Sequence, residues 1–160
     1  MIRLFSAFFA LAVAFPAAAQ APREALPIPR FVTLRSEEVN LRAGPGVRYP
    51  VEWVFVRRQL PVEVLQEFEN WRRIRDREGT EGWVHQSMLT GRRAAIVAGD
   101  MRNLRRRPEA EAPVVARVEQ GVIGSLLECK DAWCRLEAGG FRGWLPREEI
   151  WGVYPNEAIK

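Results

Sequence analysis

The sequence contains a single histidine, His85, and none of the short motifs that mark common hydrolases. It has no Gly-x-Ser-x-Gly, which presents a nucleophilic serine, and no His-Glu-x-x-His, which binds zinc. A histidine without a partner motif is ordinarily a surface residue or a hydrogen-bonded one. We therefore expect no catalytic residue, no metal site and no cofactor, and we predict that the protein is not an enzyme.

Lysine is almost absent as well. Of the 24 basic residues only Lys130 and Lys160 are lysines, so the positive charge is carried by arginine. Arginine binds carboxylate and phosphate through paired hydrogen bonds. The 20 acidic residues reduce the formal net charge to +4, which predicts a mixed, solvated surface. No base-stacking motif accompanies the arginines, so we expect no nucleic acid partner.

Only one long apolar run occurs, from Leu4 to Phe15, behind the basic Arg3. It is about 12 residues long, well short of the roughly 20 that span a bilayer. Pro16 and small residues follow it, as in a secretory signal. We predict a signal peptide over residues 1–19, no later membrane span, and a periplasmic or secreted mature protein. A proline-rich linker is expected over residues 20–33.

The remaining chain repeats itself. "NLRAGPGVRYPV" at 40–51 returns as "NLRRRPEAEAPV" at 103–114, 63 residues later. Further matched residues follow at slightly shorter offsets: Trp71 with Trp133, Gly82-Trp83 with Gly143-Trp144, and Gly91 with Gly152. The shrinking offset means that the second unit is shorter by single residues, which we place in the turns between these matches. Two units of about 60 residues are therefore predicted, over 34–92 and 95–154.

Each unit is predicted to be all-β. Short stretches of alternating or β-branched residues are separated by turn signals such as Glu69-Asn70 and Gly139-Gly140. No stretch shows a convincing helical stripe, so the pattern indicates a small sandwich or barrel. The expected strands are 51–56, 61–68, 71–76 and 82–89 in the first unit, and 114–118, 125–129, 133–137 and 143–150 in the second.

Asn-Leu-Arg-x-x-Pro, a valine-rich strand, a turn ending in Trp and a closing Gly-Trp together resemble bacterial SH3 (SH3b) domains. The resemblance covers both units, and "CKDAWCRL" and "GGFRGWLP" are similar to exported two-module proteins of this kind. It implies two tandem SH3-like barrels, each strongly bent, antiparallel and five- or six-stranded. The family often accompanies NlpC-type cell-wall peptidases, but their catalytic Cys and His need a separate domain, for which no chain remains here.

The resemblance places the first repeated motif at the start of a long hairpin, the RT loop. Gly44 and Gly46 flank Pro45, and we expect them to provide the permissive backbone angles of a tight turn. A phosphate-binding glycine loop is excluded, because such a loop needs a helix after it and a strand is predicted here.

Cys129 and Cys134 are the only cysteines, in a chain predicted to be exported. Their C-x4-C spacing differs from the C-x-x-C of redox enzymes. They flank a predicted hairpin turn and can face each other across two strands, so an oxidising compartment favours a disulfide. The alternative is a pair of buried free thiols.

Two aromatic residues have no counterpart in the other unit: Trp53 aligns with Ala116, and Tyr49 aligns with Ala112. They either line a ligand groove with nearby arginines or fill a gap in the first core. A run of arginines in the second unit is a further candidate for binding anionic wall components. The candidate ligand-binding residues are Arg42, Arg48, Tyr49, Trp53, Arg105, Arg106 and Arg107.

These observations favour a non-catalytic, exported tandem SH3b module that recognises a cell-envelope component, either peptidoglycan or an envelope protein. A protein–protein adaptor or inhibitor that binds no wall polymer is the alternative. A hydrolase of unrecognised type remains a third class.

Overall fold

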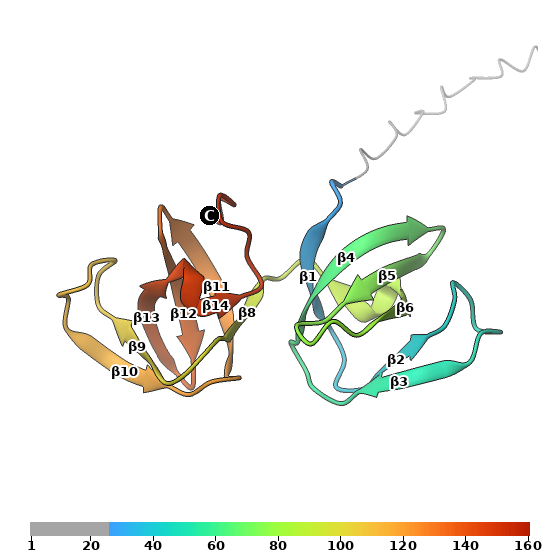
Figure 1. The fold of residues 1–160 in the computed structure, drawn as a ribbon, viewed down its shortest axis with the longest axis horizontal. Coiled ribbons are helices and arrows are strands. Elements are labelled where there is room, and N and C mark those ends of the chain that lie inside the picture. Colours follow the sequence, from blue (N-terminus) through green and yellow to red (C-terminus); the bar gives the residue numbers. More distant parts are fainter. Residues whose placement is uncertain (1–25) are drawn as a thin grey trace, which may run out of the picture.

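The computed structural model describes residues 26–160, and the predicted signal peptide lies outside the described residues. Two antiparallel sheets of seven strands each curl into two small barrels that lie side by side (Figure 1). The predicted fold class, all-β with two tandem SH3-like barrels, is confirmed. In the described part of the chain, no helix has the length and apolarity needed to cross a bilayer.

The two barrels have the same topology. The first has the strand order β3-β2-β6-β5-β4-β1-β7 and the second β10-β9-β13-β12-β11-β8-β14. The first consists of β1 (Arg30–Leu34), β2 (Val39–Arg42), β3 (Val51–Phe55), β4 (Pro61–Phe68), β5 (Trp71–Arg75), β6 (Glu81–His85), the 3-10 turn η1 (Gln86–Met88) and β7 (Leu89–Thr90). The second consists of β8 (Ala94–Val97), β9 (Arg102–Arg105), β10 (Val114–Val118), β11 (Ile123–Lys130), β12 (Trp133–Ala138), β13 (Phe141–Pro146), η2 (Arg147–Glu149) and β14 (Ile150–Trp151).

Each barrel encloses its own apolar core, supplied by alternate residues of the strands. Leu41, Ile74 and Val84 are almost completely buried in the first core. Leu104, Leu136 and Leu145 occupy the matching positions in the second. The repeat seen in the sequence is therefore a repeat of the core.

The predicted linker over 20–33 is wrong at its end, because residues 30–33 belong to strand β1. This strand pairs with β4 and β7, and the four residues from Phe31 to Leu34 are all buried. β8 is the matching strand of the second barrel, and all four of its residues are buried too. A strand covered on both faces shows no alternation of apolar and polar residues, so periodicity could not reveal either one.

Both faces of β1 are covered because the second barrel packs against the first. The Phe31 ring lies 4.9 Å from the ring of Trp151 and 4.7 Å from that of Tyr154, measured between centroids. The Tyr154 hydroxyl donates a hydrogen bond of 2.6 Å to Glu63, whose other oxygen accepts one of 2.6 Å from Arg75. These contacts join the two barrels through an apolar centre and a polar edge.

The glycine of each closing Gly-Trp motif is required for close packing. A Cβ atom on Gly82 would lie 2.5 Å from Cγ of Leu41, and one on Gly143 would lie 2.6 Å from Cβ of Leu104. Both leucines come from the Asn-Leu-Arg motif. The two repeated motifs are thus the two sides of one contact, in which a core leucine packs directly on the backbone of β6 or β13.

Gly44 has a different role from the one expected, because neither it nor Gly46 has a positive φ. The turn bonds Gly46 N to Gly44 O and Tyr49 N to Gly46 O, and the second barrel repeats this pattern without glycine, from Glu109 N to Arg107 O and from Ala112 N to Glu109 O. The Tyr49 ring explains the difference, since a Cβ on Gly44 would lie 2.5 Å from it.

We therefore predict that Gly44→Ala destabilises the protein only while Tyr49 is present. Forcing a methyl group against the ring should lower the free energy of unfolding by about 1–3 kcal/mol. In the double variant Gly44→Ala/Tyr49→Ala the clash is gone, so the two effects should be non-additive in a urea-unfolding cycle. Strictly additive losses would show that the ring does not set the requirement for glycine.

Candidate ligand-binding cleft

A disulfide-linked hairpin presents Trp133 at the surface of the second barrel. Cys129 and Cys134 face each other across β11 and β12 and are joined at 2.05 Å, as expected from the sequence. The next pair outward is Lys130 with Trp133. The covalent link is therefore one residue pair away from Trp133 along the hairpin.

Arg147 fixes the other side of this hairpin. Its guanidinium donates to the backbone oxygen of Asp131 at 3.0 Å, and to those of Tyr154 and Glu157 at 2.8 Å each. Its backbone N–H donates to Ala132 at 2.8 Å. Because these carbonyls take up most of its donors, Arg147 connects the hairpin to the C-terminal segment and has little capacity left for a ligand.

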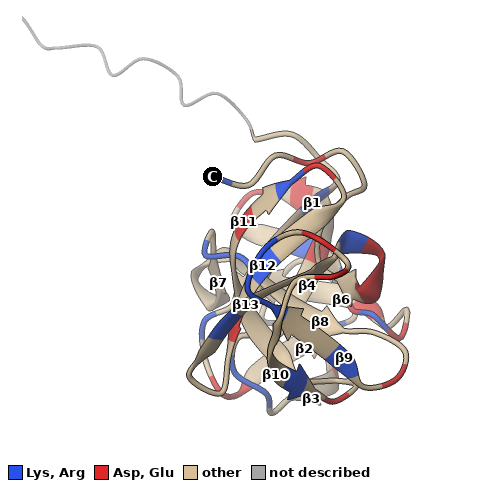
Figure 2. Cartoon of the chain, turned by 90° about the vertical axis from the view of Figure 1, so that its left-hand side faces the viewer, with Lys and Arg blue, Asp and Glu red and all other residues tan. Residues whose placement is uncertain are grey.

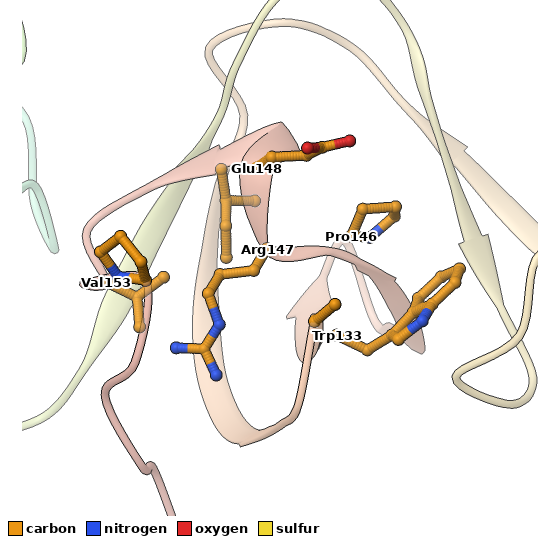
Figure 3. A pocket seen from close by; sticks show the side chains of 8 residues that line it. Trp133, Pro146, Arg147, Glu148 and Val153 are labelled. Carbon is orange, nitrogen blue, oxygen red and sulfur yellow. The ribbon is translucent and has the colours of Figure 1, made fainter.

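Trp133 and Pro146 are paired across β12 and β13 and form a common wall between two clefts. The larger cleft has a volume of about 540 Å³, and Arg147 lies between Val153 and the Trp133–Pro146 pair in it (Figure 3). The smaller one measures about 240 Å³. The larger is lined by Ala132, Trp133, Pro146, Arg147, Glu148, Ile150, Val153 and Pro155. The smaller is lined by Met101, Arg102, Asn103, Arg105, Ala110, Trp133, Pro146 and Glu149.

The larger cleft is mainly apolar, with one carboxylate at its edge. Glu148 is exposed and makes no ion pair among residues 26–160, whereas Glu149 pairs with Arg102 at 3.3 Å. An aromatic surface with a few oriented polar groups is typical of a site for a small organic ligand. The cleft can receive an apolar or sugar face on Trp133 and accept a hydrogen bond from a ligand N–H or O–H at Glu148.

In the first barrel, a different side chain lies beside the corresponding tryptophan. His85 occupies the position of Pro146, and its ring lies edge-on to Trp71 with 5.5 Å between centroids. Its Nδ1 is 2.7 Å from the Ser87 hydroxyl and accepts from the Ser87 N–H, so it caps the 3-10 turn η1. Within the part of the chain that the structure describes, no three His, Cys, Asp or Glu residues are grouped to hold a metal.

Four of the candidate ligand-binding residues lie together on the β2–β3 hairpin. Arg42 donates to the backbone oxygens of Val47 and Tyr49, at 3.1 and 2.8 Å, and so holds the hairpin in shape. Arg48 stacks on Tyr49 with 5.3 Å between its guanidinium carbon and the ring centroid. Trp53 is 55% exposed on β3, opposite Leu41.

The other three candidates lie in the second barrel, so the seven residues do not form one site. Arg105 has the same bracing role as Arg42, donating to the oxygen of Ala112 at 2.9 Å, but it also lines the smaller cleft. Arg106 is exposed, and Arg107 pairs loosely with Glu109 at 3.5 Å. Figure 2 shows basic and acidic segments interspersed along the ribbon, in agreement with the mixed surface predicted from composition.

Sequence reasoning treated Trp133 only as a repeat anchor matched by Trp71, and so missed the cleft. The difference between the repeats was the available signal. The second barrel has Pro146 where the first has His85. The histidine ring that lies against Trp71 therefore has no counterpart beside Trp133. The cysteines, which occur only in the second repeat, mark the same hairpin.

A family model for the bacterial SH3 domain matches the chain twice, at residues 35–91 and 98–152. Together these matches cover well over half of the chain, and the protein belongs to the bacterial SH3 domain family. Both matched segments fall within the barrels described above, one in each.

Similar proteins include the "Putative N-acetylmuramoyl-L-alanine amidase YrvJ" of Bacillus subtilis, 24% identical over 132 residues. That match covers 71% of this chain but only 25% of the relative, so the chain spans about a quarter of the relative's length. Among solved structures, NlpC1 and NlpC2 of Trichomonas vaginalis match with TM-scores of 0.36 and 0.37, at 13% and 12% identity. They cover 79% and 83% of this chain, and 47% and 51% of their own chains are matched.

We predict that reducing the Cys129–Cys134 bond destabilises the second barrel and leaves the first nearly unchanged. Closing so short a loop contributes about 2 kcal/mol on the chain-entropy estimate. Unfolding followed separately by resonances from each barrel, with and without reductant, measures the effect. Cys129→Ser/Cys134→Ser should reproduce the loss and then show no response to reductant. An equal loss in both barrels would contradict the local role of the bond.

Proposed function

We propose that this protein is a non-catalytic binding module of the cell envelope and that it holds a peptidoglycan fragment in the cleft beside Trp133. One observation carries the proposal: the second barrel presents an indole, braced by a disulfide and by Arg147, over an apolar cleft with a free carboxylate at its edge. Membership of the bacterial SH3 family supports a binding role. The predicted signal peptide supports an exported location.

The chemistry of peptidoglycan matches this cleft. Its sugar rings have faces of C–H groups that can lie on an indole, and its amide N–H and hydroxyl groups can donate to Glu148. The similar Bacillus subtilis protein bears the name of an amidase that would act on this polymer. The match covers only 25% of that relative, and we propose that the present chain resembles its binding part.

Co-sedimentation with purified sacculi tests the proposal. The protein should be retained, retention should survive protease treatment of the sacculi, and no soluble fragments should be released during incubation. Retention that disappears after protease treatment would mean that the partner is a protein. Release of fragments would mean that the protein is a hydrolase.

The protein–protein adaptor remains a second candidate because of exposed apolar side chains on the β2–β3 hairpin of the first barrel. β3 is at one end of its sheet, where its outer edge can pair with another strand. Val51 and Trp53 are 42% and 55% exposed, and the flanking Val56 is 78% exposed. Loss of sacculus binding after protease treatment, together with its loss in Trp53→Ser, would favour this function over the first.

We also predict a salt-dependent part of wall binding that comes from Arg106 and Arg107. Both are exposed on the β9–β10 hairpin, whose Arg105 lines the smaller cleft. Retention on sacculi should fall as added salt shortens the Debye length from about 10 to 3 Å. Arg106→Gln/Arg107→Gln should make retention weaker and less sensitive to salt. Equal salt dependence in this variant and the original protein would remove these arginines from the site.

A further inference from the structure

A second cleft, with different chemistry, lies where the two barrels meet. It has a volume of about 660 Å³ and is lined by Thr33, Leu34, Arg35, Arg58, Gln59, Thr90, Arg92, Arg93, Ala94 and Ser125. The first barrel supplies one side, and β8 with Ser125 of β11 supplies the other. None of these residues belongs to the clefts beside Trp133.

Among residues 26–160, four arginines and no carboxylate line this cleft. Arg93 is neutralised, since it donates to the carboxylate of Glu157 and to the backbone oxygen of Gly152. Arg58 has only a long contact of 3.7 Å with Glu37, between side chains that are 66% and 80% exposed. Such an exposed pair contributes little.

Arg35 and Arg92 are the uncompensated charges. Both are exposed, and neither guanidinium has an ion pair or a hydrogen bond among residues 26–160. They come from segments 57 positions apart that the fold brings to one cleft, one after β1 and one after β7. The hydroxyl groups of Thr90 and Ser125 and the amide of Gln59 add neutral hydrogen-bond donors beside them.

The barrel interface holds this arrangement in place. Thr33 donates from its hydroxyl to the backbone oxygen of Arg92 at 2.6 Å, which fixes the start of the connection between the barrels. The loop before β4 is tied across the junction by Arg57, which donates to Gly121 at 2.8 Å. The backbone that carries Arg92 is therefore fixed beside β1, close to the segment that carries Arg35.

The geometry points to a phosphate-binding site in this cleft, and we propose that it takes a ligand carrying two or more phosphate charges. A phosphate group offers three oxygens in different directions, which suits guanidinium and hydroxyl donors arriving from several segments. A planar carboxylate offers two oxygens and would leave some of these donors unused. The phosphate can belong to a lipid headgroup or to a free phosphate compound. The site is independent of the peptidoglycan cleft, and neither proposal requires the other.

Isothermal titration of the purified protein with pyrophosphate tests this site at low salt. Binding should be saturable, and Arg35→Gln/Arg92→Gln should weaken it by about tenfold or more, as expected for the loss of two charge-assisted contacts. Arg77→Gln/Arg117→Gln removes the same charge at positions that line none of the clefts and should leave binding unchanged. An unaltered melting temperature in each variant keeps the comparison valid.

Further arms of the same experiment identify the phosphate source and exclude competitors. Citrate should bind more weakly than pyrophosphate. Co-sedimentation with phosphatidic acid vesicles, compared with phosphatidylcholine vesicles, shows whether a headgroup also enters the site. The site would be overturned by absence of saturable pyrophosphate binding, by equal affinity in Arg35→Gln/Arg92→Gln, or by citrate binding as tightly. Sacculus retention in the same variant should be unchanged, which separates this result from the peptidoglycan proposal.

Discussion

Replacing Trp133 by alanine should lower the affinity for sacculi by about tenfold or more. The indole forms the wall shared by both clefts of the second barrel, and a tryptophan at the centre of a binding site commonly contributes 2 kcal/mol or more. Since 1.4 kcal/mol corresponds to a factor of ten, the loss should be clear in a quantitative co-sedimentation assay.

The repeat supplies a matched control for this change. Trp71 has the same place in the first barrel, but the ring of His85 lies against it. Trp71→Ala should therefore affect stability and leave sacculus binding nearly unchanged. Glu148→Gln keeps the shape of an exposed side chain and should weaken binding several-fold without changing the melting temperature. Equal losses in the two tryptophan variants would contradict a site in the second barrel.

Replacing Phe31 by alanine should separate the unfolding of the two barrels. Phe31 is only 8% exposed and lies between β1 of the first barrel and Trp151 and Tyr154 of the second. Losing a buried phenyl group costs about 3–5 kcal/mol, and here most of that cost falls on the interface. A single unfolding transition in calorimetry should become two.

Phe141→Ala is the control, because Phe141 is 56% exposed and should be replaceable without measurable effect on cooperativity. If calorimetry of Phe31→Ala still shows one transition, the barrels do not depend on this contact. Two transitions already present in the original protein would show that the interface does not couple them.

The polar edge of the same interface should make the interface less stable at alkaline pH. Burial, together with the hydrogen bond and negative charge of Glu63, raises the pKa of Tyr154 above its usual value of 10. The protonated phenol is thus favoured in the folded state. Its contribution should be complete below about pH 10 and should be lost as pH rises toward the higher folded-state pKa. Tyr154→Phe should remove this part of the pH dependence.

The C-terminal segment should instead lose stability as the pH becomes acidic. Burial alone would raise the pKa of Glu157, but hydrogen bonds from Arg93 and from the Tyr154 backbone, with the charges of Arg93 and Arg147, lower it. The ionised carboxylate is favoured in the folded state. Its contribution should therefore be present above the ordinary Glu pKa and should be lost as pH falls below it.

Much of the fold was predictable because the residues that the two units share are residues that pack together. The leucine of each Asn-Leu-Arg packs on the glycine of the matching Gly-Trp in the neighbouring strand, so both motifs occur in both units although the residues between them differ. The predicted strand 61–68 is β4 as the structure has it. The predicted strand 82–89 is divided into β6, η1 and β7, since the bend at His85 has no periodic signature.

The remaining features depend on contacts that the order of residues does not show. β1 and β8 lack alternation because the barrels cover them on both sides. Gly44 looked like a turn residue, but glycine is required there because the Tyr49 ring, five positions later, leaves no room for a side chain. Arg42 and Arg105 looked like ligand-binding charges, whereas both brace their own hairpins. In each case a neighbour in space, absent from the local pattern, determines the role.

The most direct test of peptidoglycan binding is an NMR titration of the nitrogen-15-labelled protein with soluble fragments of protease-treated sacculi. Each of the six tryptophans has an indole N–H that can be followed in the titration. We expect the Trp133 indole and the amides of Ala132, Arg147 and Glu148 to shift in a saturable manner, while the Trp53 and Trp71 indoles stay in place. No saturable shift at Trp133, or shifts confined to the β2–β3 hairpin, would contradict the proposed site.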